Sequence, residues 1–314
     1  MSRSTLRTII AGIIIMIFIA VGTAGAVALA QDSLRQQALT DNGERADAAG
    51  LAVERVLSAN IENVRRFAVR TSFLRAAVSK KYTSLGSDLS TLVASNVTFS
   101  SAGYYSSDAR LRARSPAAPK LLGFAFSKQD YFRRAASKGS YVSAMYHPAA
   151  EPKLLVVSFS VAVRSTAGKL VGVLVASAPI ADLDRAFAST IPTTGSIQIF
   201  NHAGQRVSPA KSASVRSFQS NDTVARALSG SAGSRLGVVS GEGVQFISYA
   251  PAGADWAVVL ERPQTAVAAR SRSLRTRLIA IGAALALLTF LALVIAGAPP
   301  TPKSARARPA EPTP

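Results

Sequence analysis

Cysteine is absent from this chain, and histidine occurs only twice in 314 residues. Without Cys there is no disulfide and no thiolate for zinc or for nucleophilic catalysis, so the redox compartment is left open. His147 precedes a proline and His202 falls in an expected turn, so the two do not have metal-ligand spacing. A Gly-x-Ser-x-Gly elbow and a glycine-rich phosphate loop are also missing. We therefore predict that the chain is not an enzyme and holds no cofactor or metal.

Charge is missing from two long apolar runs, residues 8–30 and 278–296. As helices they would be roughly 34 Å and 28 Å long, against a bilayer hydrocarbon core of about 30 Å. We predict two transmembrane helices there. The first run also allows a cleavable signal peptide, because Arg3 and Arg7 precede it and Ala28-Leu29-Ala30 resembles a cleavage site. Its apolar part is longer than that of a typical signal peptide, so we favour an uncleaved anchor.

The flanking charges give the orientation. Arg3 and Arg7 lie before the first run, which places residues 1–7 in the cytoplasm and exports the chain that follows. Four arginines between 270 and 277 argue for the opposite orientation of the second run. Long loops cross the membrane largely regardless of their charge, so we follow the first run. The expected location is the plasma membrane, with two spans and an extracytoplasmic domain.

Acidic residues are scarce: 17 Asp and Glu face 36 Lys and Arg, for a net charge of +19. Nucleic acid is the usual partner of such a basic chain. Most of this excess lies between the two apolar runs, in the part expected outside the cytoplasm, where nucleic acid is rarely met. We expect attraction to anionic lipid head groups, envelope polymers or anionic solutes instead.

Residues 31–80 show a helical pattern directly after the first run. Apolar residues recur at helical spacing along one face, and charged residues occupy the opposite face. The members of this apolar face are Val53, Leu57, Ile61, Val64 and Ala68. A helix that continues out of a membrane span suits a stalk, or a dimerisation helix that would make the protein a homodimer. Packing of the helix on its own domain is the other interpretation.

Residues 81–190 predict a small antiparallel sheet with helices. Ser127 and Asp130 match a capping box for a short helix that ends near Gly139. Alternating apolar residues predict strands at 98–106, 141–146, 154–164 and 169–178, with a basic loop at 110–119. Pro179 then begins another helix.

Residues 191–277 repeat this arrangement with less helix. Expected strands are 196–200, 205–207, 234–240, 244–250 and 256–261, and Asn221 is a candidate helix cap. The last residues before 278 continue as a helix into the second apolar run. The tail, 297–314, is rich in proline and arginine and is predicted to be disordered. The fold class is therefore α+β: a long N-terminal stalk helix, two antiparallel-sheet modules and two flanking transmembrane helices.

Several short motifs occur in the order found in one family. They are Gln129-Asp130-Tyr131-Phe132 with Ala135, Tyr146, Gly168-Lys169-Leu170-Val171-Gly172-Val173-Leu174, Ile197-Gln198-Ile199-Phe200-Asn201-His202-Ala203-Gly204 and Trp256-Ala257-Val258-Val259. With these motifs the exported region resembles the double Cache sensor domain, a PAS-like pair found outside the cytoplasm in bacterial chemoreceptors, histidine kinases and diguanylate cyclases. The resemblance implies a membrane-distal module, 81–190, and a membrane-proximal module, 191–277.

The resemblance also implies a small-molecule ligand in the distal module. Carried onto this sequence, its candidate ligand-binding residues are Gln129, Tyr131, Phe132, Tyr146 and Ser177. Amino-acid-binding members are similar but carry Arg at the place of Gln129 and Asp at the place of Ser177. Arg clamps a carboxylate and Asp takes an α-ammonium group, so an amino acid is not expected here.

Three basic residues flank the motif that begins at Gln129. Lys128, Arg133 and Arg134 would favour an anionic ligand, or they form a solvated helix face, which is the commoner arrangement. Of the two neighbouring aromatic residues, Tyr131 and Phe132, we expect one in the core and the other in the pocket.

Two functions follow. The first is a membrane-anchored extracytoplasmic sensor that binds a small molecule in the distal module and relays this through the membrane. Only the proline-rich tail follows the second apolar run, so the output would be a separate cytoplasmic or membrane partner. The alternative is a structural or interaction protein of the cell envelope, with a degenerate Cache pocket and a basic surface.

Overall fold

A computed structural model describes residues 3–191, 195–239, 243–253 and 255–297. The chain divides into two compact units, one of residues 1–37 with 265–314 and one of residues 38–264. The tail expected to be disordered lies outside the described residues except for Gly297. Residues 241–242, in the connection between the strands expected at 234–240 and 244–250, also lie outside the described residues.

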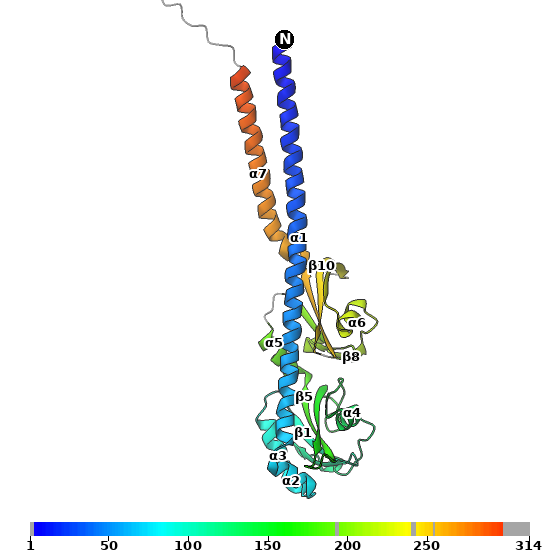
Figure 1. The fold of residues 1–314 in the computed structure, drawn as a ribbon. Coiled ribbons are helices and arrows are strands. Elements are labelled where there is room, and N and C mark those ends of the chain that lie inside the picture. The colour runs from blue at the N-terminus through cyan, green and yellow to red at the C-terminus, as the bar shows by residue number, and fades with distance from the viewer. Residues whose placement is uncertain (1–2, 192–194, 240–242, 254, 298–314) are drawn as a thin grey trace, which may run out of the picture. The chain divides into compact units, whose positions relative to one another are not determined.

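Helices begin and end the described part of the chain and form several of the connections between strands (Figure 1). Their bounds are α1 Arg3–Ala68, α2 Thr71–Val78, α3 Tyr82–Ala94, α4 Asp130–Lys138, α5 Ile180–Thr190, α6 Asp222–Leu228 and α7 Gln264–Gly297. Two 3-10 turns, η1 Pro119–Leu121 and η2 Ala210–Ser212, complete the helical elements of the described chain.

Two antiparallel sheets form the body of residues 38–264. The first sheet has the order β2-β1-β5-β4-β3, and the second has the order β8-β7-β6-β11-β10-β9. The first contains β1 Ser101–Ser106, β2 Leu111–Ser115, β3 Ser140–Val142, β4 Val156–Arg164 and β5 Leu170–Pro179. The second contains β6 Ser196–Phe200, β7 Gln205–Ser208, β8 Ser214–Ser217, β9 Gly233–Val239, β10 Gly243–Ala252 and β11 Trp256–Pro263. From β7 to β9 the second sheet repeats the strand order of the first, and β8 is an added edge strand.

Both sheets are covered on two faces. One continuous core joins α1, α2, α3 and α5 to the first sheet and reaches the second sheet at Ile199, Trp256 and Val258. A separate cluster packs α4 on the first sheet, and another packs α6 on the second. In Figure 1, α4 and α6 are seen beside the sheet that each of them covers. This arrangement encloses the space between α4 and the first sheet, where the site described below lies.

The stalk helix predicted for residues 31–80 is interrupted. The structure ends α1 at Ala68 and begins α2 at Thr71, with Arg70 in an extended conformation between them. The break turns Phe73 inward, where its ring meets Phe67 at 5.9 Å and Tyr104 at 5.7 Å, both edge to face. Burial of Phe73, which is fully inaccessible, outweighs the helix propensity of a segment that contains neither Gly nor Pro.

The capping box predicted at Ser127 is wrong. The cap of α4 is Gln129, whose side chain makes no capping hydrogen bond, and Asp130 forms an ion pair with Arg133 one turn later. The helix does end at Gly139, with φ of 90°, as expected. The cap predicted at Asn221 is confirmed, because its side chain accepts hydrogen bonds from the backbone of Thr223 and Val224.

Two strands also differ from their prediction. The basic loop expected at 110–119 contains β2, paired antiparallel with β1. The strand expected at 141–146 is β3, which begins at Ser140 and ends at Val142. Beyond it the chain still follows β4, because Ser143 donates to Ser158 and Tyr146 exchanges two backbone hydrogen bonds with Val156.

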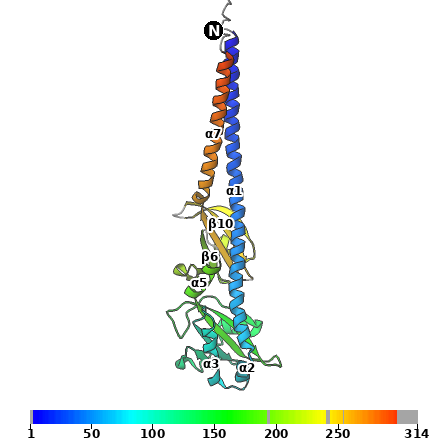
Figure 2. The same cartoon turned by 90° about the vertical axis from the view of Figure 1, so that its left-hand side faces the viewer.

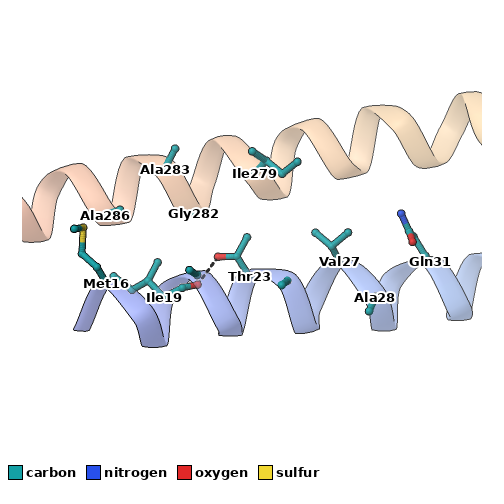
Figure 3. Close-up of a pocket in the computed structure, with 12 residues that line it drawn as sticks. Met16, Ile19, Thr23, Val27, Ala28, Gln31, Ile279, Gly282, Ala283 and Ala286 are labelled. Carbon is teal, nitrogen blue, oxygen red and sulfur yellow. Dashed lines mark hydrogen bonds between the residues drawn. The ribbon is translucent and has the colours of Figure 1, made fainter. Parts of the chain in front are cut away.

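The N-terminal part of α1 is long and apolar enough to cross a membrane. Within the described residues searched, it is the one helix that meets this length and composition; α7 contains a shorter apolar stretch, Thr276–Ala292. The two helices lie side by side in both views (Figures 1 and 2). Small residues face one another where they meet, and a Cβ added to Gly282 would lie 2.6 Å from Oγ1 of Thr23 (Figure 3).

Candidate functional site

A small cavity lies between α4 and the first sheet. Its volume is about 40 Å³, enough for roughly three water molecules at 10–15 Å³ each. Its walls come from β1, β2 and β5, from η1 and α4, and from the loop between β3 and β4. Most of these residues are apolar or aromatic, with a small number of polar groups among them, as is usual in ligand pockets.

Three tyrosines form the aromatic part of the cavity wall. The rings of Tyr131 and Tyr146 stack with centroids 5.4 Å apart, and Tyr105 contacts Tyr131 at 5.7 Å. Phe126 meets Tyr105 edge to face at 5.3 Å. Residue Tyr131 points inward because α4 buries the face that carries Tyr131, Phe132 and Ala135.

Hydroxyl groups line the floor of the site. The Tyr146 hydroxyl lies 2.6 Å from Oγ of Ser158, which lies 2.9 Å from Oγ of Ser177. Burial raises the pKa of the Tyr105, Tyr131 and Tyr146 hydroxyls above that of free tyrosine. The three hydroxyls therefore stay protonated at physiological pH and can donate hydrogen bonds to a bound molecule.

One cationic side chain lines the cavity, and sequence reasoning missed it. Arg114 on β2 is 11% exposed, donates to Oε1 of Glu151 at 3.1 Å and to the carbonyl of Pro116 at 2.7 Å. The basic loop predicted at 110–119 includes Arg114 and leaves out the strand that positions it. The alternation of Leu111, Ala113 and Ser115 with Arg112 and Arg114 has the strand period and could have revealed it.

The five candidate residues fall into two groups. Tyr131, Tyr146 and Ser177 line the cavity. Gln129 is exposed at the start of α4, and Phe132 is packed in the cluster beneath the helix. Neither of these two is among the described residues of the cavity wall.

The basic residues of α4 and its approach lie outside the cavity. Lys128, Arg133 and Arg134 are exposed. Arg133 pairs with Asp130, and the guanidinium of Arg134 lies over the ring of Tyr141 at 5.3 Å. They form a solvated helix face. In the described part of the chain, no group of three or more acidic or histidine side chains is placed to hold a metal ion.

Comparison with known protein families identifies the family to which this chain belongs. The model of the Cache domain matches residues 30–271, which is most of the chain. The chain belongs to the Cache domain family. The match covers both antiparallel sheets and the part of α1 that packs on them.

Solved Cache sensor structures share the fold of this chain. The ligand-binding domain of the Campylobacter jejuni chemoreceptor Tlp3, solved with L-valine, aligns with a TM-score of 0.57 at 15% identity, over 75% of this chain and 96% of that one. The Pseudomonas fluorescens chemoreceptor CtaA, also solved with L-valine, gives 0.56 at 16% identity over 72% and 97%. The Pseudomonas aeruginosa chemoreceptor PctC, solved with GABA, gives 0.52 at 16% identity over 72% and 100%. No curated protein sequence matches the chain.

Proposed function

We propose that this chain is a membrane-anchored extracytoplasmic sensor that binds a small molecule in the cavity between α4 and the first sheet. The observation that carries the proposal is the aromatic and hydroxyl-lined cavity built by Tyr131, Tyr146 and Ser177 on a Cache fold. Chemoreceptor structures of the same fold hold amino acids or GABA, which supports a ligand-binding role here.

In this proposal the two sheets are tandem Cache modules. The first, within residues 81–190, is membrane-distal and holds the ligand; the second, within 191–277, is membrane-proximal. The shared strand order of the two sheets supports a tandem pair. Residues 31–80 form the stalk, as α1 followed by α2, and a homodimer would form through α1.

The membrane part of the proposal has residues 8–30 as an uncleaved anchor and 278–296 as a second span, with residues 1–7 in the cytoplasm. The apolar N-terminal part of α1 supports the anchor. The second span is supported by the close approach of Gly282 to Thr23, because small residues at helix contacts are typical of membrane pairs.

A covalent and hydrogen-bonded route leads from the cavity toward the second sheet. Ser177 lies near the end of β5, which continues directly into α5. On α5, Asp184 accepts hydrogen bonds from the Ser208 hydroxyl and from the backbone N–H of Ala210, the latter at 3.0 Å. If the ligand binds more tightly when β5 is in one of two alternative positions, its binding favours that position. The movement of β5 would then shift α5 and the second sheet. The signal would then reach a separate membrane or cytoplasmic partner through α1 and α7.

A thermal-shift screen of the full chain in detergent tests the binding role. A metabolite at 100 times its dissociation constant should stabilise the domain by about 2.7 kcal/mol. Tyr131→Ala should abolish the shift, whereas Phe132→Ala, a buried neighbour that does not line the cavity, should retain it. A shift that survives Tyr131→Ala would place the ligand elsewhere.

The small cavity also favours a second candidate function. About 40 Å³ leaves little room for a metabolite without movement of the wall, and the chain carries a net charge of +19. An envelope structural or interaction protein would give no response in the screen and salt-sensitive binding to anionic polymer.

A further inference from the structure

Arg114 is the one cationic residue among the described residues that line the cavity, and no acidic residue lines it. A ligand held there meets the guanidinium of Arg114, whose carboxylate partner, Glu151, is not among the lining residues. An ammonium group would find no carboxylate partner in the wall, and burial of an unpaired charge is costly. The electrostatics favour a ligand with a single negative charge.

The guanidinium of Arg114 is paired with the carboxylate of Glu151. This carboxylate binds Nη2 of Arg114 at 3.1 Å, yet the side chain of Glu151 is 41% exposed. Glu151 can therefore turn toward solvent at little cost, while Arg114, at 11% exposure, stays where it is. The carboxylate of a ligand would replace the carboxylate of Glu151 on the guanidinium. Arg114 would therefore keep a negatively charged partner when the ligand binds.

The rest of the wall defines the other end of the ligand. Leu111, Leu121, Phe126 and Val175 provide apolar surface, and the cavity volume is about 40 Å³. Phosphate or sulfate would place charged oxygens against this apolar surface, which is costly. A short alkyl chain would fill it and would release ordered water.

We propose, on the basis of the sensor function proposed above, that the ligand is a short-chain monocarboxylate whose carboxylate replaces that of Glu151 on Arg114. The tyrosine hydroxyls of Tyr105 and Tyr131 lie 3.4 Å apart in the same cavity and can supply further donors. The alkyl end lies among the apolar residues between η1 and β5. The ligand carries no ammonium group, because no carboxylate lines the cavity in the described chain.

Calorimetry and thermal shift on the full chain in detergent test this with four probes: sodium propionate, its neutral isostere propionamide, L-alanine and inorganic phosphate. Propionate should bind saturably, and the other three should bind at least tenfold more weakly. Charge-assisted hydrogen bonds contribute about 1.5–3 kcal/mol, which corresponds to a 10–100-fold change in affinity.

Variants on β2 supply the matched control. Arg114→Gln should weaken propionate binding by 10-fold or more, and Arg114→Lys should weaken it less because it keeps the charge but loses the planar fork. Arg112→Gln removes the same charge from the same strand, where Arg112 pairs with Asp108, and should leave binding unchanged. Glu151→Gln should tighten binding by removing the competing carboxylate. Circular dichroism checks that each variant is folded.

The outcomes separate the two proposals. Equal binding of propionamide and propionate, or equal loss in the Arg114 and Arg112 variants, would overturn the carboxylate assignment. A neutral or cationic compound whose binding depends on Tyr131 would also overturn it while leaving the sensor function in place. Absence of binding by any compound would overturn both.

Discussion

The hydroxyl of Tyr141 lies 2.8 Å from Nε2 of His202, and this contact links the two sheets. Tyr141 belongs to β3 of the first sheet, and His202 lies in the turn between β6 and β7 of the second. A second link runs nearby, from the backbone N–H of Met145 to Oε1 of Gln205 at 2.8 Å. Beside them is a cavity of about 260 Å³, whose wall also includes Glu54 of α1.

Removal of this link should destabilise the domain modestly. Tyr141→Phe deletes the hydroxyl and keeps the ring, so the free energy of unfolding should fall by about 1 kcal/mol, the usual net value of one hydrogen bond. Tyr82→Phe is the matched control, because no hydrogen bond is described for the Tyr82 hydroxyl and its ring packs near Tyr104 at 6.2 Å. Chemical denaturation of both variants measures the difference. Equal losses would mean that the Tyr141 hydroxyl contributes nothing specific.

Stability should depend on pH through His202. Burial lowers the pKa of His202 below its ordinary value; the charges of Asp255 and Asp130 oppose this shift, and those of Arg134 and Lys138 add to it. The folded state therefore binds fewer protons than the unfolded state between the lowered pKa and about 6.5. The contribution of His202 to the free energy of unfolding is complete above about pH 6.5 and declines as the pH falls toward the pKa of His202 in the folded state.

Denaturation between about pH 5 and 7.5 tests this prediction. His202→Asn should flatten the dependence, while His147→Asn, at an exposed loop position, should preserve it. A dependence that persists unchanged in His202→Asn would assign the effect to other groups.

Two helical glycines should respond in opposite directions to alanine. A Cβ at Gly50 on α1 would lie 2.3 Å from the carbonyl oxygen of Pro251 on β10, so Gly50→Ala forces helix and sheet apart. Overpacking of this kind costs about 1–3 kcal/mol, against a helix-propensity gain of up to about 1 kcal/mol. Gly86 on α3 has open space around it, so Gly86→Ala should stabilise the protein. Urea denaturation gives both values; a stable Gly50→Ala variant would contradict the close packing of α1 on β10.

The contact between α1 and α7 can be tested by cross-linking, because the chain has no native cysteine. A Cβ at Gly282 would lie 3.3 Å from Cβ of Thr23. The Cβ atoms of a disulfide are roughly 3.5–4.5 Å apart, so this pair is close enough to be bridged. Thr23→Cys with Gly282→Cys should form an intrachain disulfide in membranes under mild oxidation. Phe18→Cys with Leu287→Cys, at exposed positions, should not. Cross-links only between chains would contradict an intrachain helix pair.

The sequence predicted those features that local chemistry determines. The helix cap at Asn221, the helix start after Pro179 and the hairpin strands β4 and β5 depend on nearby residues, and all are present. The interruption of α1 at Ala68 was not predictable in this way. It depends on the burial of Phe73 against Tyr104, two residues that are far apart in sequence.

The same reasoning explains the gaps in the predicted site. Of the neighbours Tyr131 and Gln129, Tyr131 lines the cavity, whereas the cap position turns the side chain of Gln129 to solvent. Asp184 has no local sequence signal for its contacts, because it binds Ser208 and Ala210 only where the second sheet comes against α5. The neighbours of Arg114 have the strand period, but its place in the cavity wall depends on the pairing of β2 with β1, which is a tertiary contact.

Hydrogen–deuterium exchange on the full chain, with and without the most stabilising compound of the thermal-shift screen, tests the central claim most directly. The account predicts slower exchange in peptides that contain Tyr131, Tyr146 and Ser177, since these residues surround the bound molecule. A weaker change should follow in α5 and β7. Protection confined to the second sheet or to α7, with none around Tyr131, would contradict a sensor pocket beneath α4.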